Sequence, residues 1–181
     1  MTIPGIEQRV ILVDSISKRF SACGARIGCL GTKNREVLDC CMRFAQARLS
    51  PPGLGQIAAV PALSLPPSYY EGFVREFEAR RNTVLELFEA EPSIRCRPPR
   101  GAFYIMATLP VDDADAFIRW MLNSFEREGE TVMAAPGDGF YATPGMGKQE
   151  IRIAYVFEQQ VLRRAVSILL EGLRHYPGRQ A

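Results

Sequence analysis

The chain has 181 residues, of which 47% are apolar and 23% are charged, and its formal net charge is +2. This is the composition of an ordinary globular protein, and the length is sufficient for a buried core. The small net charge and the scattered basic residues argue against a nucleic-acid partner. No apolar run approaches the length of a membrane span, so we expect no membrane partner either.

Cysteine and histidine usage argues against a metal centre. The sequence has a single histidine, His175, and no pair of its five cysteines has the two-residue spacing of a zinc site. An odd number of cysteines without a signal-peptide pattern is typical of a reducing compartment, so we expect a cytoplasmic protein. The five are Cys23, Cys29, Cys40, Cys41 and Cys96.

The first third of the chain is expected to form two strands and two helices. Apolar runs at residues 10–13 and 26–30 predict short strands, the first of them buried. Asn34 is a candidate N-cap for a helix over residues 35–49. Residues 54–65 are apolar on nearly all sides, which predicts a buried helix. A buried strand needs neighbours on both sides, so we expect these two strands to be the edge of a larger sheet.

The rest of the chain is expected to form a long helix and a small α+β layer. The helix is predicted from a cap at Ser68 to about Glu91. The pattern then reads β-β-α-β-β-α, which predicts a mostly antiparallel sheet with helices on one face. The strands are expected at residues 94–97, 102–106, 131–134 and 151–156, and the helices from Asp112 or Asp113 to Gly129 and over residues 158–175.

These elements predict an α/β fold in which a two-stranded sheet edge with helices is joined to a small α+β domain. The predicted domains are residues 1–65, a connecting helix over residues 66–92, and residues 93–181.

Residues 14–28, directly after the first strand, carry the side chains that could react with or bind a ligand. Lys18 has an amine that can attack a carbonyl when it is neutral. Ser15 and Ser17 alternate, which places both hydroxyls on one face of an extended segment. Arg26 offers a planar fork of donors suited to a phosphate dianion. A phosphate and an aldehyde on one small molecule describe pyridoxal phosphate, whereas a solvated surface loop is the alternative that these residues leave open.

Two motifs in this stretch resemble a known signature. Residues 15–20, Ser-Ile-Ser-Lys-Arg-Phe, and residues 24–28, Gly-Ala-Arg-Ile-Gly, resemble the Ser-x-Ser-Lys-x-Phe and Gly-x-Arg-x-Gly motifs of aspartate-aminotransferase-like enzymes. These are class I/II enzymes of fold type I that depend on pyridoxal 5'-phosphate. The resemblance implies that Lys18 forms the Schiff base with the cofactor and then moves the proton. It also implies that Ser15, Ser17 and Arg26 hold the phosphate.

The resemblance continues to the end of the chain. Residues 99–104, 135–140, 145–147 and 151–154 are similar to later family motifs, in the same order. Arg152 stands where the family binds the substrate α-carboxylate through a bidentate pair. From the residues alone, an arginine in an apolar strand is costly to bury unless it is paired, and a surface-facing arginine is the alternative.

The resemblance implies transfer of an amino group between an amino acid and a 2-oxo acid by a homodimeric enzyme. It covers only the later part of the family's chain. The family places the aromatic ring that stacks on the cofactor, and the aspartate at its pyridine nitrogen, before the lysine strand, and nine residues precede Val10 here. We therefore expect a carboxyl-terminal part that binds the cofactor poorly alone. A lyase of the same fold and a non-catalytic truncated module are the alternatives.

Overall fold

The structure is a computed structural model, and it describes residues 3–180. The chain divides into two compact units, Met1–Tyr69 and Tyr70–Ala181, which are described separately below. Within the described range, none of the helices combines the length and the apolar character that crossing a membrane requires.

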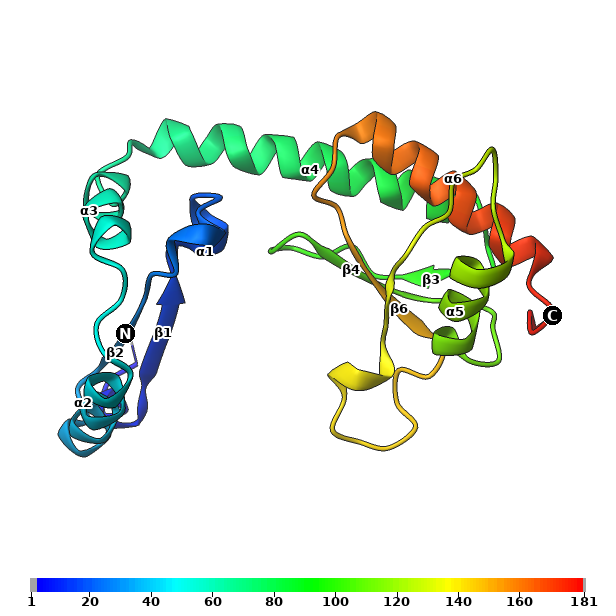
Figure 1. Cartoon of the computed structure of the whole chain (residues 1–181). Helices are drawn as coiled ribbons and strands as arrows, with labels where there is room; N and C mark the ends of the chain where they lie inside the picture. The colour runs from blue at the N-terminus through cyan, green and yellow to red at the C-terminus, as the bar shows by residue number, and fades with distance from the viewer. Residues whose placement is uncertain (1–2, 181) are drawn as a thin grey trace. The chain divides into compact units, whose positions relative to one another are not determined.

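The first unit is built on a hairpin of β1 (Ile11–Ser15) and β2 (Gly28–Thr32). The two strands are antiparallel and pair from Ile11 with Thr32 to Ser15 with Gly28 (Figure 1). The other elements are η1 (Glu7–Arg9), α1 (Ile16–Arg19), η2 (Cys23–Ala25), α2 (Arg35–Arg48) and α3 (Gly53–Ala62).

Short-range interactions define the helices of this unit. The side chain of Asn34 accepts a hydrogen bond of 3.1 Å from the backbone N–H of Val37, so the predicted cap of α2 is confirmed. Helix α3 packs closely on the chain before β2, because a Cβ at Gly55 would lie 2.6 Å from the carbonyl oxygen of Ala25. This close approach holds the backbone next to Arg26 in place.

The predicted burial of the first unit is wrong. The side chain of Val13 in β1 is 75% exposed, and Leu54 and Ile57 of α3 are 85% and 71% exposed. Within α3 only Gly55 and Ala59 are buried. The apolar pattern predicts burial on both faces, but a two-stranded hairpin with two helices provides no second apolar layer to cover it.

The second unit contains a four-stranded antiparallel sheet in the order β3-β4-β6-β5. Its elements follow the predicted order β-β-α-β-β-α, so the prediction of an α+β layer is confirmed. The strands are β3 (Arg95–Cys96), β4 (Tyr104–Thr108), β5 (Ala135–Pro136) and β6 (Glu150–Ala154), and the helices are α4 (Pro67–Glu89), which begins before the unit boundary, α5 (Ala114–Ser124) and α6 (Gln159–His175).

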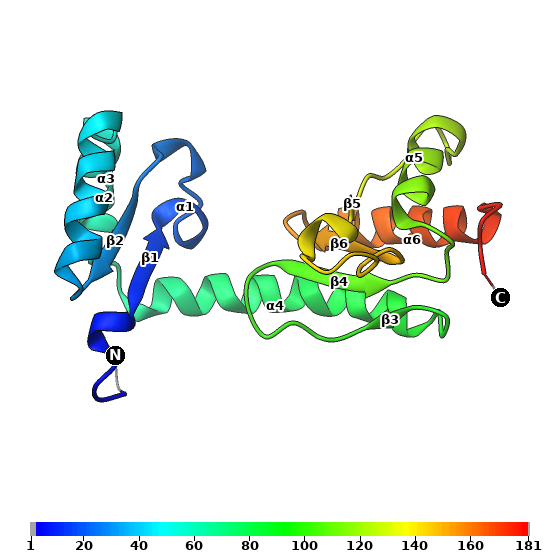
Figure 2. The same ribbon diagram turned by 90° about the horizontal axis from the view of Figure 1, so that it is seen from below.

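One face of this sheet carries the hydrophobic core. Ile105 and Ile151 are fully buried, together with Val84 of α4 and Leu173 of α6. The two helices lie side by side (Figure 1 and Figure 2), and Thr83 donates a hydrogen bond to the Gln159 side chain at 3.2 Å. Side chains alternate along a strand, so the neighbours of the buried residues lie on the opposite face of the sheet.

Three predicted boundaries in this unit are wrong. Helix α4 begins at Pro67, so Ser68 is not its cap, and α5 ends at Ser124 rather than at Gly129. Gly129 instead has a positive φ of 79° in the turn that joins Arg127 to Glu130. The strand expected at residues 131–134 does not form, and a two-residue strand, β5, pairs at Ala135–Pro136 instead.

Other predictions for this unit are confirmed. Asp113 caps α5 by accepting a hydrogen bond of 3.0 Å from the Ala116 N–H, and α6 ends at His175.

The two units should differ in local stability. We expect backbone amides of β1 and α3 to exchange with deuterium ~10-fold faster or more than those of β4 and α6, because the first unit has few buried apolar contacts. Hydrogen-exchange mass spectrometry of the whole chain measures this difference. Equal protection of the two sets of peptides would contradict the account.

The second unit should lose stability in acid through Glu91. The hydrogen bond from the Ser93 hydroxyl at 2.7 Å, followed by the charges of Arg179 and Arg174, lowers the pKa of Glu91. A lowered pKa in the folded state stabilises the fold above the ordinary carboxyl range, and this contribution is lost as the pH falls through the lowered pKa.

We expect Glu91→Gln to reduce the free energy of unfolding by about 1 kcal/mol at pH 7 and by less at pH 3. Urea unfolding followed by Trp120 fluorescence measures both values. Glu89→Gln, a change at an exposed side chain of α4, is the control. An equal loss at both pH values would show that the charge of Glu91 is not responsible.

Candidate functional site

Ser15 and Ser17 meet where β1 passes into α1. Ser15 has an extended backbone, and its hydroxyl oxygen accepts a hydrogen bond of 3.1 Å from the backbone N–H of Ser17. The two hydroxyl oxygens lie 2.9 Å apart. The assumption of an extended segment is therefore wrong, since Ser17 stands in a helical turn. A capping turn brings the two hydroxyls together instead.

Arg26 lies at the other end of the same turn. Its backbone is left-handed, with φ 57° and ψ 39°, and its Nη1 donates a hydrogen bond of 3.0 Å to the carbonyl oxygen of Cys23. No ion pair of Arg26 occurs among residues 3–180. Arg19, by contrast, pairs with Asp14 at 2.7 Å. Arg26 is therefore the guanidinium of this turn whose charge is not balanced by a described carboxylate.

The hairpin register fixes the distance between the two ends of the turn. Ser15 pairs directly with Gly28, and a Cβ at Gly28 would lie 2.8 Å from the carbonyl oxygen of Asp14. A larger residue would push the strands apart at the point that joins the serines to Arg26. The hydroxyl of Ser15 also lies within hydrogen-bond distance, 3.2 Å, of the Ile27 carbonyl oxygen.

Lys18 extends from α1 toward Cys23. Its Nζ donates to the Cys23 Sγ at 3.7 Å. The Cys23 thiol in turn donates to the carbonyl oxygen of Ser17 at 3.3 Å. The sequence did not single out Cys23, because nothing in its spacing indicates that the turn would bring its side chain to the lysine.

Arg152 lies in the second unit, on the sheet face opposite the core. It stands in β6, paired with Met106 of β4 and with Ala135 of β5. Its guanidinium carbon lies 4.5 Å from the ring centroid of Tyr104 and 4.2 Å from that of Phe140. The side chain is half-buried and forms no ion pair within residues 3–180. Cation–π contacts with two aromatic rings, and no ion pair with a described carboxylate, therefore stabilise this guanidinium.

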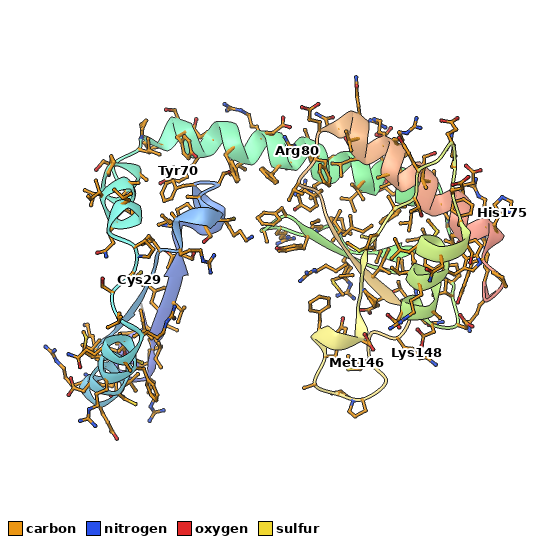
Figure 3. The ribbon with its side chains drawn as sticks, in the orientation of Figure 1. Cys29, Tyr70, Arg80, Met146, Lys148 and His175 are labelled. Carbon is orange, nitrogen blue, oxygen red and sulfur yellow. The ribbon has the colours of Figure 1, made fainter. Side chains whose placement is uncertain are left out.

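The loop before β6 places Phe140 against Arg152. The N–H of Gly137 donates to the carbonyl oxygen of Glu150 at 2.7 Å, where a Cβ on Gly137 would meet the Glu150 side chain at 2.6 Å. The Tyr141 hydroxyl donates to Glu150 at 2.5 Å, and this hydrogen bond raises the pKa of Tyr141. Met146 and Lys148 mark the outer part of the same loop (Figure 3).

The structure thus brings Ser15, Ser17, Lys18 and Arg26 together in one turn of the first unit, whereas Arg152 belongs to the second unit. The aromatic rings of Tyr104 and Phe140 are neighbours of Arg152 that the sequence did not reveal. Their only signal was membership of motifs near a strand, which does not report contact with an arginine.

Over residues 3–180 there is no group of three or more side chains that could hold a metal ion. His175 ends α6 (Figure 3), and its ring lies 6.1 Å from that of Phe125. All five cysteines are free thiols.

Comparison with known proteins points to one family. The model of the family "Aminotransferase class I and II" matches residues 2–169. Aspartate aminotransferase from Rhizobium meliloti is 26% identical over 175 residues, which cover 90% of this chain and 40% of that protein. A crystal structure of aspartate aminotransferase from Rhizobium meliloti matches with a TM-score of 0.76 at 25% identity, covering 94% of this chain and 43% of that chain.

A further structure shows the likeness of the fold alone. It is the α-aminoadipate aminotransferase from Thermus thermophilus, complexed with N-(5'-phosphopyridoxyl)-L-leucine. It matches with a TM-score of 0.79 at 23% identity and covers 92% of this chain and 42% of that chain. The chain therefore spans about two fifths of the length of these relatives. Its fold is the expected part of a pyridoxal-phosphate transferase, and the chain belongs to the aminotransferase class I and II family.

Proposed function

We propose that this chain carries the lysine, the phosphate-binding residues and the carboxylate-binding residue of a pyridoxal-phosphate-dependent aminotransferase. The reaction is transfer of an amino group between an amino acid and a 2-oxo acid. One observation carries the proposal: a single turn brings an amine, two hydroxyls and a guanidinium with no described acidic partner together. A cytoplasmic homodimer is part of the same proposal, and it is supported by family membership and by the odd number of cysteines in the sequence.

The residues of the turn fit the cofactor. Guanidinium and hydroxyl donors are the groups that bind a phosphate dianion. Arg26 uses one donor on the carbonyl of Cys23 and has four more, and the hydroxyls of Ser15 and Ser17, 2.9 Å apart, are further donors in the same turn. The nearby carboxylate of Asp14 is neutralised by Arg19, so it does not oppose an anion. Ser15, Ser17 and Arg26 would hold the phosphate, and Lys18 would hold the aldehyde carbon.

When bound, pyridoxal phosphate supplies an electron sink for the bond that breaks at the substrate α-carbon. Lys18 has two tasks in this reaction. Its amine would hold the cofactor through the aldehyde carbon. As a free amine, Lys18 would also accept the proton from the substrate α-carbon and return it to the substrate.

Arg152 would bind the substrate α-carboxylate through two parallel hydrogen bonds. The guanidinium of Arg152 lies against the rings of Tyr104 and Phe140. They leave its N–H groups unpaired within the described residues while they restrict its motion. A cation that is oriented before the substrate arrives loses less entropy on binding.

The role of Lys18 can be tested by absorption spectroscopy. We expect excess pyridoxal phosphate to change its visible absorption when mixed with the full chain, because a primary amine and the aldehyde combine. Lys18→Ala should abolish this change, and Lys33→Ala, a change at a lysine outside the turn, should preserve it. The same spectrum from wild type and Lys18→Ala would contradict the proposal.

The role of Arg152 can be tested by substituting it with lysine, which keeps the charge and removes the planar fork. We expect Arg152→Lys to weaken amino-acid binding to the cofactor-loaded protein by about tenfold or more, measured by calorimetry. Arg97→Lys, at an exposed position beyond β3, is the matched control. The corresponding amine without a carboxylate should bind equally to both variants and to wild type. If it lost affinity as the amino acid does, Arg152 would not be the carboxylate partner.

A further inference from the structure

Cys23 contacts three of the four residues that form the turn. Its Sγ lies 3.7 Å from the Nζ of Lys18 and donates to the carbonyl oxygen of Ser17 at 3.3 Å. Its own carbonyl oxygen accepts from Arg26 at 3.0 Å. One residue therefore links the amine, the segment of the serines and the guanidinium.

These contacts separate into a side-chain part and a backbone part. The Arg26 hydrogen bond ends on the backbone carbonyl of Cys23, so it does not depend on which side chain stands at position 23. The contact with Lys18 depends on the sulfur. A thiol donates through its proton and accepts weakly through its lone pairs, so Cys23 can donate to Ser17 and accept from Lys18 at the same time.

The geometry limits where the amine can go. The lysine side chain is a flexible stem of four carbons, and an unrestrained amine at its end samples many positions. Ser17 O is itself fixed, because it also accepts from the backbone N–H of Ala22 at 3.0 Å. The thiol is thus anchored on a fixed carbonyl, and the lysine amine lies 3.7 Å from its sulfur.

We propose that Cys23 is a positioning residue, whose thiol restrains the amine of Lys18 within the turn that also carries Arg26. The inference rests on the proposed function of Lys18. It adds a residue that acts through the lysine and does not itself touch the cofactor.

The contact can be tested without cofactor by ortho-phthalaldehyde. This dialdehyde condenses with a primary amine and a thiol that lie close together, releases two water molecules and leaves a fluorescent isoindole. The chain has three lysines, Lys18, Lys33 and Lys148, so the readout is simple to assign. We expect isoindole fluorescence from wild type and its loss in Lys18→Arg and in Cys23→Ser.

Matched changes outside the turn serve as controls for this reaction. Lys33→Arg removes another lysine, and Cys29→Ser removes an exposed thiol of β2 (Figure 3), and both should keep the wild-type yield. Wild-type fluorescence from Cys23→Ser would overturn the assignment of the pair.

The positioning role needs a second measurement, the rate at which the full chain captures pyridoxal phosphate. We expect Cys23→Ala to slow capture by about threefold, the effect of one weak hydrogen bond, and Cys23→Ser to restore the rate because a hydroxyl also donates and accepts. A wild-type rate in Cys23→Ala, or no rescue by serine, would overturn the proposal. If isoindole forms but no protein captures the cofactor, the proposed function of Lys18 fails and the positioning role fails with it.

Discussion

The hydroxyl of Ser15 is the contact on which the functional turn depends. It accepts a hydrogen bond of 3.1 Å from the backbone N–H of Ser17, at the point where β1 ends and α1 begins. It also lies 3.2 Å from the carbonyl oxygen of Ile27, across the hairpin. Gly28 lets the strands close there, since its missing Cβ would meet Asp14 at 2.8 Å. These local contacts place Lys18 and Arg26 on one turn even though the surrounding unit exposes much of its apolar surface.

In the second unit, the packing of the core against one face of the sheet positions Arg152. The core fixes β6 by burying Ile151 and the helix residues behind it, so strand alternation turns Arg152 to the opposite face. There the rings of Tyr104 and Phe140 replace an acidic partner. A carboxylate partner would leave the guanidinium neutralised, whereas aromatic faces leave its hydrogen-bond donors available for an anion.

The features that were predicted correctly from the sequence are those that local hydrogen bonds and helical periodicity determine. The caps at Asn34 and Asp113 and the end of α6 follow from local hydrogen bonding and helical periodicity. The predicted burial of β1 and α3 is wrong, because a two-stranded hairpin with two helices provides no second apolar layer. The contact of Cys23 with Lys18 depends on how the turn after α1 folds back, and that of Phe140 with Arg152 depends on a loop packed on Glu150. Neither contact leaves a periodic signal in the sequence.

The central claim is that Lys18, alone among the three lysines of the chain, is the residue that binds a carbonyl cofactor. The most direct measurement is to mix the full chain with pyridoxal phosphate, reduce the mixture with borohydride and locate the pyridoxyl group by peptide mass spectrometry. The account predicts modification of Lys18, with little on Lys33 or Lys148. Equal labelling of all three lysines, or labelling that spares Lys18, would contradict it.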